Sequence, residues 1–130
     1  MSNRKPLSFA PSEGDIIHAN LDPVHGDIQK EKRPYLVVSI RQFNEHFGLC
    51  MVSPITNGIG ANGDAIGESP FFIDVESKRG RGERVTGKVI ANQFATIDWR
   101  HPGYECSYTS TAKSEVLEEV KKALKVYANL

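Results

Sequence analysis

Hydrophobic residues along this chain fall into short runs separated by polar and glycine-rich stretches, a pattern typical of β-strands joined by turns. The clearest run, residues 34–40, is almost entirely apolar and begins with a proline, which predicts a strand buried on both faces. Further strands are predicted at residues 16–21, 48–55, 71–75, 87–91 and 104–108. Short strands of this kind favour a compact antiparallel sheet or a small barrel.

The stretches between these runs predict loops and one short helical turn. Residues 24–32 are polar and indicate a surface loop. Residues 57–70 contain four glycines and few apolar side chains, which predicts a mobile loop. Residues 42–47 predict the helical turn.

The last segment of the chain changes from a strand period to a helical one. Ser114 can cap the start of a helix, glutamates occupy its first turns and lysines follow, an order that suits the helix dipole. This order permits a Glu118–Lys122 ion pair one turn apart. The apolar positions form one stripe: Val116, Leu117, Val120, Ala123, Leu124 and Tyr127. We expect this helix to lie across the barrel in a structural role.

The length of 130 residues fits one domain whose core can fold without disulfides or metals. No run approaches the ~18 apolar residues of a membrane helix. The first twelve residues also lack the apolar segment of a signal peptide. Cys50 and Cys106 are too few for a disulfide scaffold. We therefore expect a cytoplasmic protein without membrane association.

Charge is balanced overall, with 16 basic and 16 acidic residues, but it is unevenly distributed along the chain. Between residues 78 and 88 there is a local excess of four positive charges, with Glu83 as the one acid. The basic residues of this stretch are Lys78, Arg79, Arg81, Arg84 and Lys88. Such a stretch is either a solvated surface segment or an electrostatic track for nucleic acid, and both interpretations stay open.

The chain contains no common catalytic motif. Its four histidines lack the spacing of a zinc site and have no carboxylate cluster beside them, so no metal is expected. It also lacks a nucleophile elbow and a Walker lysine. Polar residues do mark the strand ends: Arg33 before one strand, Ser53 and Thr56 at the end of another, and Asn92 and Gln93 after a third. They would meet at one rim of a barrel, although a salt-bridged arginine and turn-forming hydroxyls give the same pattern.

Several short motifs follow one another in an order shared with a known family. The motifs are Gly14-Asp15-Ile16, Leu21-Asp22-Pro23, Gly26 followed by Gln29, Arg-Pro-Tyr-Leu-Val-Val-Ser at residues 33–39, Pro54-Ile55-Thr56, and Gln-Phe-Ala-Thr-Ile-Asp-Trp-Arg at residues 93–100. In this combination the chain resembles the MazF/PemK family, the toxins of type II toxin–antitoxin modules. The resemblance extends over nearly the whole chain.

The resemblance implies a mainly β fold with α: an SH3-like small β-barrel of the CcdB/PemK type with a C-terminal helix. Residues 1–12 would be an N-terminal extension and residues 13–130 the toxin domain. It also implies a homodimer that cleaves single-stranded RNA as a sequence-selective endoribonuclease and needs no cofactor. The implied partners are a cognate MazE/PemI-like antitoxin, single-stranded RNA, and operator DNA bound only together with the antitoxin.

The chemistry of RNA cleavage explains which side chains such an enzyme needs. The 2′-hydroxyl of RNA is a nucleophile that already lies beside the phosphate. The protein has to help remove its proton, stabilise charge on the phosphorane and protonate the leaving 5′ oxygen. Arg33 and Thr56 match the catalytic arginine and threonine of the family, so the resemblance implies that Arg33 stabilises the phosphorane and Thr56 binds the scissile phosphate. The expected products carry 2′,3′-cyclic phosphate and 5′-hydroxyl ends.

Two departures from the family pattern leave the general base open. Some relatives have an aspartate where this chain has Asn92, whose amide cannot act as a base, and an arginine where it has Ile90. Many relatives have a histidine after the loop glycine, where this chain has Asp27, while His25 precedes Gly26. Our hypothesis is that His25 takes the 2′ proton, because an unperturbed imidazole has a pKa near ~6.5. The alternatives are a solvated loop histidine and an Asp27 that only caps a turn.

Residues expected to bind substrate lie in the loops, the basic stretch and the strand ends. They are Asp27, Gln29, Lys32, Ser53, Asn57, Lys78, Arg79, Arg81, Arg84, Asn92 and Gln93. Trp99 and Phe94 could stack on bases, although a core or dimer-interface position is the commoner role for such aromatics. Two other functions stay open: a non-nucleolytic toxin of the same fold, such as a CcdB-like gyrase poison, and an inactive nucleic-acid-binding module.

Overall fold

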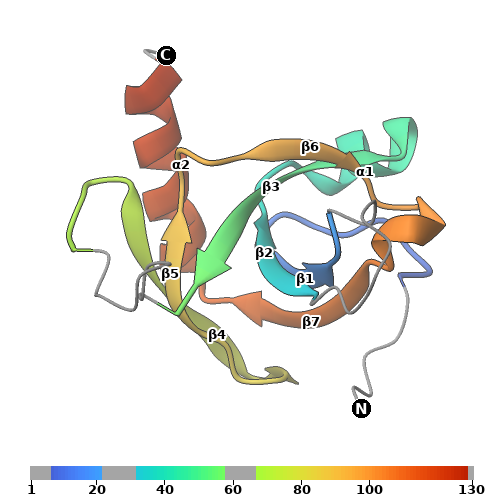
Figure 1. Cartoon of the computed structure of the whole chain (residues 1–130), viewed down its shortest axis with the longest axis horizontal. Coiled ribbons are helices and arrows are strands. Elements are labelled where there is room, and N and C mark those ends of the chain that lie inside the picture. Colours follow the sequence, from blue (N-terminus) through green and yellow to red (C-terminus); the bar gives the residue numbers. More distant parts are fainter. Residues whose placement is uncertain (1–6, 22–31, 58–66, 129–130) are drawn as a thin grey trace, which may run out of the picture.

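The computed structural model describes residues 7–21, 32–57 and 67–128. Within these residues the chain forms seven strands, two α-helices and one 3-10 turn, drawn in Figure 1. The strands are β1 (Asp15–Ala19), β2 (Arg33–Val37), β3 (Leu49–Thr56), β4 (Phe72–Gly82), β5 (Thr86–Ile90), β6 (Ala95–Asp98) and β7 (Ser107–Ala112). The helices are α1 (Arg41–Phe47) and α2 (Ser114–Ala128), and the 3-10 turn is η2 (Pro102–Tyr104).

The strands form one antiparallel sheet that closes on itself. The hydrogen-bonded order is β2-β1-β7-β4-β5-β3-β6, and β2 also pairs with β3. That last pairing joins β2, β1, β7, β4, β5 and β3 into a ring, while β6 is added to β3 on the side of α1 (Figure 1). The mainly β fold with a C-terminal helix is therefore confirmed, and the closed ring is consistent with the expected small barrel.

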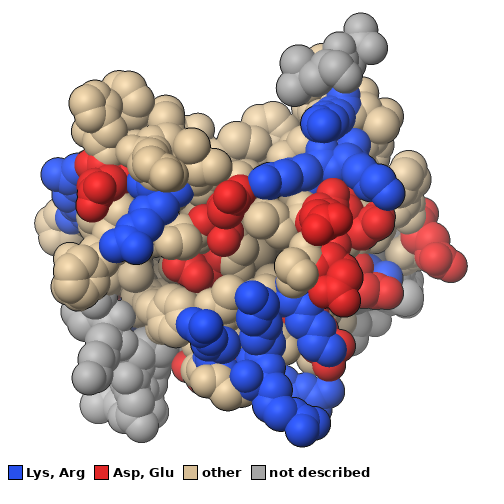
Figure 2. Space-filling view, turned by 180° about the vertical axis from the view of Figure 1, so that it is seen from behind, with Lys and Arg blue, Asp and Glu red and all other residues tan. Residues whose placement is uncertain are grey.

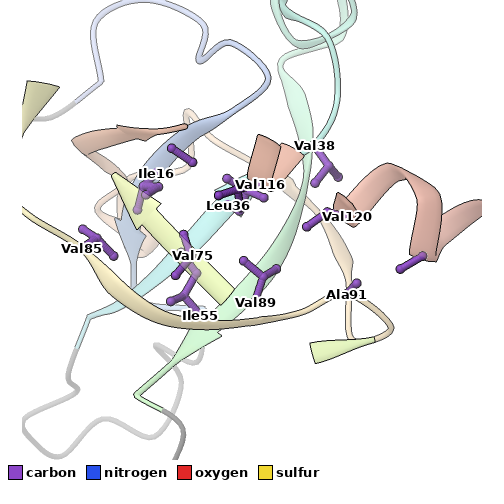
Figure 3. Packing of buried hydrophobic residues seen from close by; sticks show 12 residues of the cluster. Ile16, Leu36, Val38, Ile55, Val75, Val85, Val89, Ala91, Val116 and Val120 are labelled. Atoms are coloured by element: carbon purple, nitrogen blue, oxygen red, sulfur yellow. The ribbon is translucent and has the colours of Figure 1, made fainter. Parts of the chain in front are cut away.

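The main hydrophobic core fills this ring (Figure 3). Ile16 of β1, Val75 of β4 and Val89 of β5 point into it from different sides. Val116 and Val120 of α2 pack against the same cluster, so the apolar stripe of the helix is buried as the sequence pattern predicts. The helix has the structural role expected of it.

A second hydrophobic cluster lies on the other face of β2 and β3. In β2, Leu36 belongs to the main core and Val37 to this second cluster, which confirms that the strand is buried on both faces. Val52 of β3 and Ile97 of β6 complete its centre, with Trp99 partly buried against it. The two faces of β2 and β3 therefore support separate clusters.

The structure differs from the sequence-based prediction in three elements. Strand β6 was not predicted, and β4 continues to Gly82, well beyond residue 75. The strand predicted at 104–108 begins only at Ser107, because η2 occupies the preceding residues. Within α2, Lys122 pairs with Glu119 at 3.6 Å, so the predicted Glu118–Lys122 pair is wrong.

The segment that precedes β1 packs onto the sheet. The Leu7 backbone amide donates to the carbonyl of Cys106 at 3.1 Å, and the side-chain Nδ2 of Asn44 donates to the carbonyl of Pro11 at 2.8 Å. The division of the chain at residue 12 stays a prediction. Neither described helix is long and apolar enough to cross a membrane.

Candidate active site

Arg33 and Thr56 lie at the same end of two paired strands. Arg33 begins β2 and Thr56 ends β3, and the strands run antiparallel. Tyr35 lies opposite Pro54, so the same register carried two residues further places Arg33 opposite Thr56. Residues two apart on a strand face the same side, and directly opposed Cβ atoms are about 5 Å apart. Arg33 and Thr56 therefore lie at the same strand edge, two positions beyond the Tyr35–Pro54 pair.

Arg33 is exposed and has no ion-pair partner within residues 7–21, 32–57 and 67–128. Its backbone pairs with Ala19 of β1, so the strand rather than a carboxylate fixes its position. The guanidinium also acts on Tyr35: burial raises the pKa of that phenol, and the positive charge of Arg33 partly offsets the rise. The alternative of an arginine neutralised by a nearby acid therefore has no support in the described residues.

Thr56 is held by close packing between β3 and β5. It lies opposite Lys88, whose ammonium pairs with Asp74 at 2.9 Å. Gly87, with φ +132°, lies so close that a Cβ there would be 2.2 Å from the Thr56 carbonyl oxygen. Only glycine allows β5 to lie this close to the Thr56 backbone, and this contact fixes the position of Thr56 at the end of β3.

The basic stretch forms the exposed outer part of β4 and the residues that follow it. Lys78, Arg79, Arg81 and Arg84 are all exposed. Lys78, Arg79 and Arg84, but not Arg81, line a cavity of about 360 Å³ together with Lys113, and Glu76 is its acid, paired with Lys113 at 3.0 Å. Figure 2 shows Lys and Arg side chains in separate groups with acids between them, so this face has no continuous basic surface.

Arg81 of the basic stretch and Arg33 lie at different ends of β1. Arg81 precedes Gly82, which lies opposite Ser110 of β7, and Ser110 lies opposite Ile16, the residue after Asp15. Burial raises the pKa of Asp15, and the charges of Arg41 and Arg81 partly offset the rise. Asp15 begins β1, whereas Ala19, the partner of Arg33, ends it. RNA would have to extend along the barrel to contact both Arg33 and Arg81, whereas Lys88 lies opposite Thr56.

The polar residues predicted at the strand ends are only partly brought together. Asn57 follows Thr56 and is exposed, whereas Asn92 and Gln93 follow the far end of β5. Asn92 comes four residues after Lys88, which lies opposite Thr56. At the rise of a β-strand this separation is about 13 Å. Its Oδ1 atom is buried without a hydrogen-bond partner in the described residues.

One expected substrate-binding residue is placed in the interior. Ser53 is fully buried, so no substrate can reach it in this conformation, and its assignment is wrong. The alternation of β3 explains this: Pro54 and Thr56 share one face, and Ser53 points to the other. Its Oγ atom has no hydrogen-bond partner in the described chain.

Three predicted site residues, His25, Asp27 and Gln29, lie outside the described residues. Within the described part of the chain, no group of three or more His, Cys, Asp or Glu side chains could hold a metal ion.

Sequence reasoning missed a cavity of about 410 Å³ beside Lys32. It is built mostly from residues 99–107, between β6 and β7, where η2 replaces the predicted start of a strand. The run Trp-Arg-His-Pro at residues 99–102 was a usable signal, since aromatic and basic side chains are concentrated there.

Comparisons with known proteins agree with this fold. A family model described as the PemK-like, MazF-like toxin of type II toxin–antitoxin systems matches residues 12–128. The chain therefore belongs to this family, which confirms the resemblance in the sequence. The endoribonuclease toxin MazF of Escherichia coli strain K12 is 27% identical over 122 residues, 94% of each chain.

Solved structures give the same result. The crystal structure of MazF from Deinococcus radiodurans matches with a TM-score of 0.71 and 28% identity, over 94% of this chain and 99% of that chain. A MazE–MazF crystal structure from the same organism matches with a TM-score of 0.67 and 24% identity, over the same shares of the two chains.

Proposed function

We propose that this protein is an endoribonuclease toxin that cleaves single-stranded messenger RNA at selected sequences without a metal ion. The observation that supports this most is the position of Arg33 in a chain of the MazF-like family. It is exposed, free of acidic partners in the described residues, and at the same end of the β2–β3 pair as Thr56. A fixed cation beside a hydroxyl is the arrangement that a phosphorane needs.

The proposed reaction starts with attack of the 2′-hydroxyl on the adjacent phosphorus. Arg33 donates two hydrogen bonds to the phosphoryl oxygens through its planar guanidinium and stabilises the additional charge. Thr56 donates a third from its hydroxyl and orients the phosphate. As the bond to the 5′ oxygen breaks, that oxygen takes a proton from the Arg33 guanidinium, which is protonated again from water, and the products are a 2′,3′-cyclic phosphate and a 5′-hydroxyl. DNA lacks the nucleophile and should remain intact.

The general base of this reaction is proposed to be His25. Its imidazole suits proton transfer near neutral pH. Asn92 cannot replace it, because an amide does not accept the proton. Replacement of His25 by alanine should lower the cleavage rate and change its pH profile, and an unchanged rate and profile would exclude the assignment.

The remaining parts of the proposal concern partners and location. The exposed residues Lys78, Arg79, Arg81 and Arg84 would contact the RNA backbone, and Lys32, Asn57 and Gln93 would contact the substrate nearer the strand ends. The protein would act as a homodimer in the cytoplasm. A MazE/PemI-like antitoxin would silence it and would recruit it to operator DNA, in line with the related MazE–MazF complex.

The proposal is tested by incubating the purified protein with single-stranded RNA and with DNA of the same sequence, in the presence of a chelator. We expect RNA cleavage with cyclic phosphate ends, intact DNA, and loss of cleavage in Arg33→Ala. Intact RNA together with inhibited gyrase would instead indicate a CcdB-like poison. Intact RNA without gyrase inhibition would indicate an inactive binding module.

A further inference from the structure

The cavity beside Lys32 has the size and walls of a ligand site. Its volume of about 410 Å³ lies within the usual range for small-molecule pockets. Its lining includes Leu7, Lys32, Trp99, His101, Glu105 and Ser107. Lys32 directly precedes Arg33, and neighbouring Cα atoms are about 3.8 Å apart. One wall of the cavity is therefore a single residue away from Arg33 along the chain.

Fixed aromatic rings form part of the cavity wall. The Trp99 indole N–H donates to the carbonyl of Asn44 at 2.9 Å. The Arg100 guanidinium carbon lies 5.1 Å from the centre of the Trp99 ring. The His101 ring stacks on Tyr104 with centroids 4.6 Å apart. Rings held in this way offer flat surfaces to a planar ligand at little entropic cost.

The polar groups of the cavity include one without a partner. Ser107 is 3% exposed, and its Oγ atom has no hydrogen-bond partner in the described residues. A buried hydroxyl in this state costs free energy unless a ligand satisfies it. His101 Nδ1 accepts from the Gly103 amide at 2.9 Å, so the proton of the neutral ring is on Nε2.

Glu105 adds a second unusual feature. It is the one non-glycine residue with positive φ in the described chain, at φ 50°. Its carboxylate lies 3.4 Å from the Lys32 ammonium. Glu105 caps the end of η2 in this left-handed conformation, and non-glycine residues in such conformations cluster at ligand sites. The cavity therefore offers acceptors and donors together with flat apolar walls.

We propose that this cavity binds one nucleobase of the RNA substrate, directly beside the scissile phosphodiester. The proposal rests on the proposed endoribonuclease function. Binding of this base would be the main contact by which the enzyme selects the sequence it cleaves. The base lies against the Trp99 side of the cavity, Ser107 hydrogen-bonds to its edge, and Glu105 accepts from an exocyclic amino group. The adjacent position of Lys32 and Arg33 favours RNA over a side chain of an antitoxin as the occupant.

Trp99 supplies a direct test, because it is the one tryptophan of the sequence. The probe is a short RNA cleaved by the protein, with a 2′-deoxy substitution at the cleavage position so that it binds uncut. We expect this oligonucleotide to quench the tryptophan emission. Ser107→Ala and Glu105→Gln should each weaken binding of the probe about tenfold.

The second measurement maps cleavage sites in a pool of random RNA. Ser107→Ala and Glu105→Gln should relax selection at one base next to the cut, while cleavage itself persists. Glu119→Gln, on the exposed face of α2, is the matched control and should keep the wild-type selection. Thermal unfolding verifies that each variant is folded, and Ser107→Ala should not lower the unfolding midpoint because it removes an unpaired buried hydroxyl.

The outcomes separate this inference from the proposed function. If the wild-type protein cleaves no RNA, the proposed function fails and this inference fails with it. If cleavage occurs but both folded variants keep the wild-type selection and quenching, the base site is wrong while the function stands. If the variants cleave normally and instead escape the antitoxin, the cavity binds a peptide and the inference is overturned.

Discussion

Gly87→Ala tests whether the position of Thr56 at the end of β3 controls catalysis. Gly87 of β5 lies against the backbone of Thr56, and its φ of +132° is in a region that alanine rarely adopts. A Cβ atom at this position would be 2.2 Å from the Thr56 carbonyl oxygen, whereas real contacts of this kind are at least 3.0 Å. The end of β3 and the facing part of β5 therefore have to separate by about 0.8 Å or more, which is the shortfall between these distances.

This movement has two measurable consequences. The strained backbone should lower the free energy of unfolding by about 2 kcal/mol. A catalytic group displaced by about 1 Å should lower kcat about 100-fold, equivalent to about 2.7 kcal/mol in the activation free energy. Urea unfolding measures the first quantity, and cleavage of a fluorescent RNA at saturating concentration measures the second.

Gly82→Ala is the matched control for the steric effect. Gly82 has φ +79°, and a Cβ there would lie 2.0 Å from the carbonyl oxygen of Thr109 in β7, away from Thr56. We expect a similar loss of stability but nearly normal kcat in the folded fraction. Full kcat in Gly87→Ala, or an equal loss in Gly82→Ala, would refute the reasoning.

Three further predictions concern buried groups. Ser53→Ala should raise the free energy of unfolding by up to about 1 kcal/mol in thermal or urea unfolding, because it removes a buried hydroxyl without a described partner; a loss of stability would show that the hydroxyl is satisfied. Burial raises the pKa of Cys50 to about 12 and that of Cys106 to about 11, so iodoacetamide should label neither thiol near about pH 8 until denaturant is added; rapid labelling of the native protein would contradict this. Burial raises the pKa of Asp15, so the folded state binds the carboxyl proton more tightly than the unfolded state does, and the contribution of Asp15 to stability falls as pH rises through the folded pKa. Asp15→Asn should remove this part of the pH dependence of the unfolding free energy, measured by urea titration. An unchanged dependence on pH would contradict the prediction.

The sequence predicted those strands whose own residues form a continuous apolar run. The continuous apolar run of β2 needs no partner to be recognised, and it is buried on both faces as expected. Strand β6 was missed because Thr96 and Asp98 are polar and exposed, and its pairing with β3 depends on residues far away in the sequence. The strand predicted at 104–108 begins only at Ser107, because Glu105 adopts a left-handed backbone conformation that the local sequence pattern does not predict.

Only those residues of the candidate site that lie at the ends of predicted strands could be predicted from the sequence. Arg33 and Thr56 flank apolar runs, and the antiparallel register places them at one end of the β2–β3 pair. Ser53 was misassigned because the face of a strand residue depends on the exact register, and one residue changes its side. The cavity beside Lys32 could not be foreseen, since its lining combines the segment before β1 with residues 99–107.

The central claim is that Arg33 and Thr56 act on the same phosphodiester. Its most direct test is a double-mutant cycle of Arg33→Ala and Thr56→Ala, measured as kcat/KM on one RNA in the presence of a chelator. We predict that each single change lowers kcat/KM at least about 100-fold and that the double change costs far less than the product of the two losses. Losses that multiply independently, or wild-type activity in either single variant, would contradict the claim.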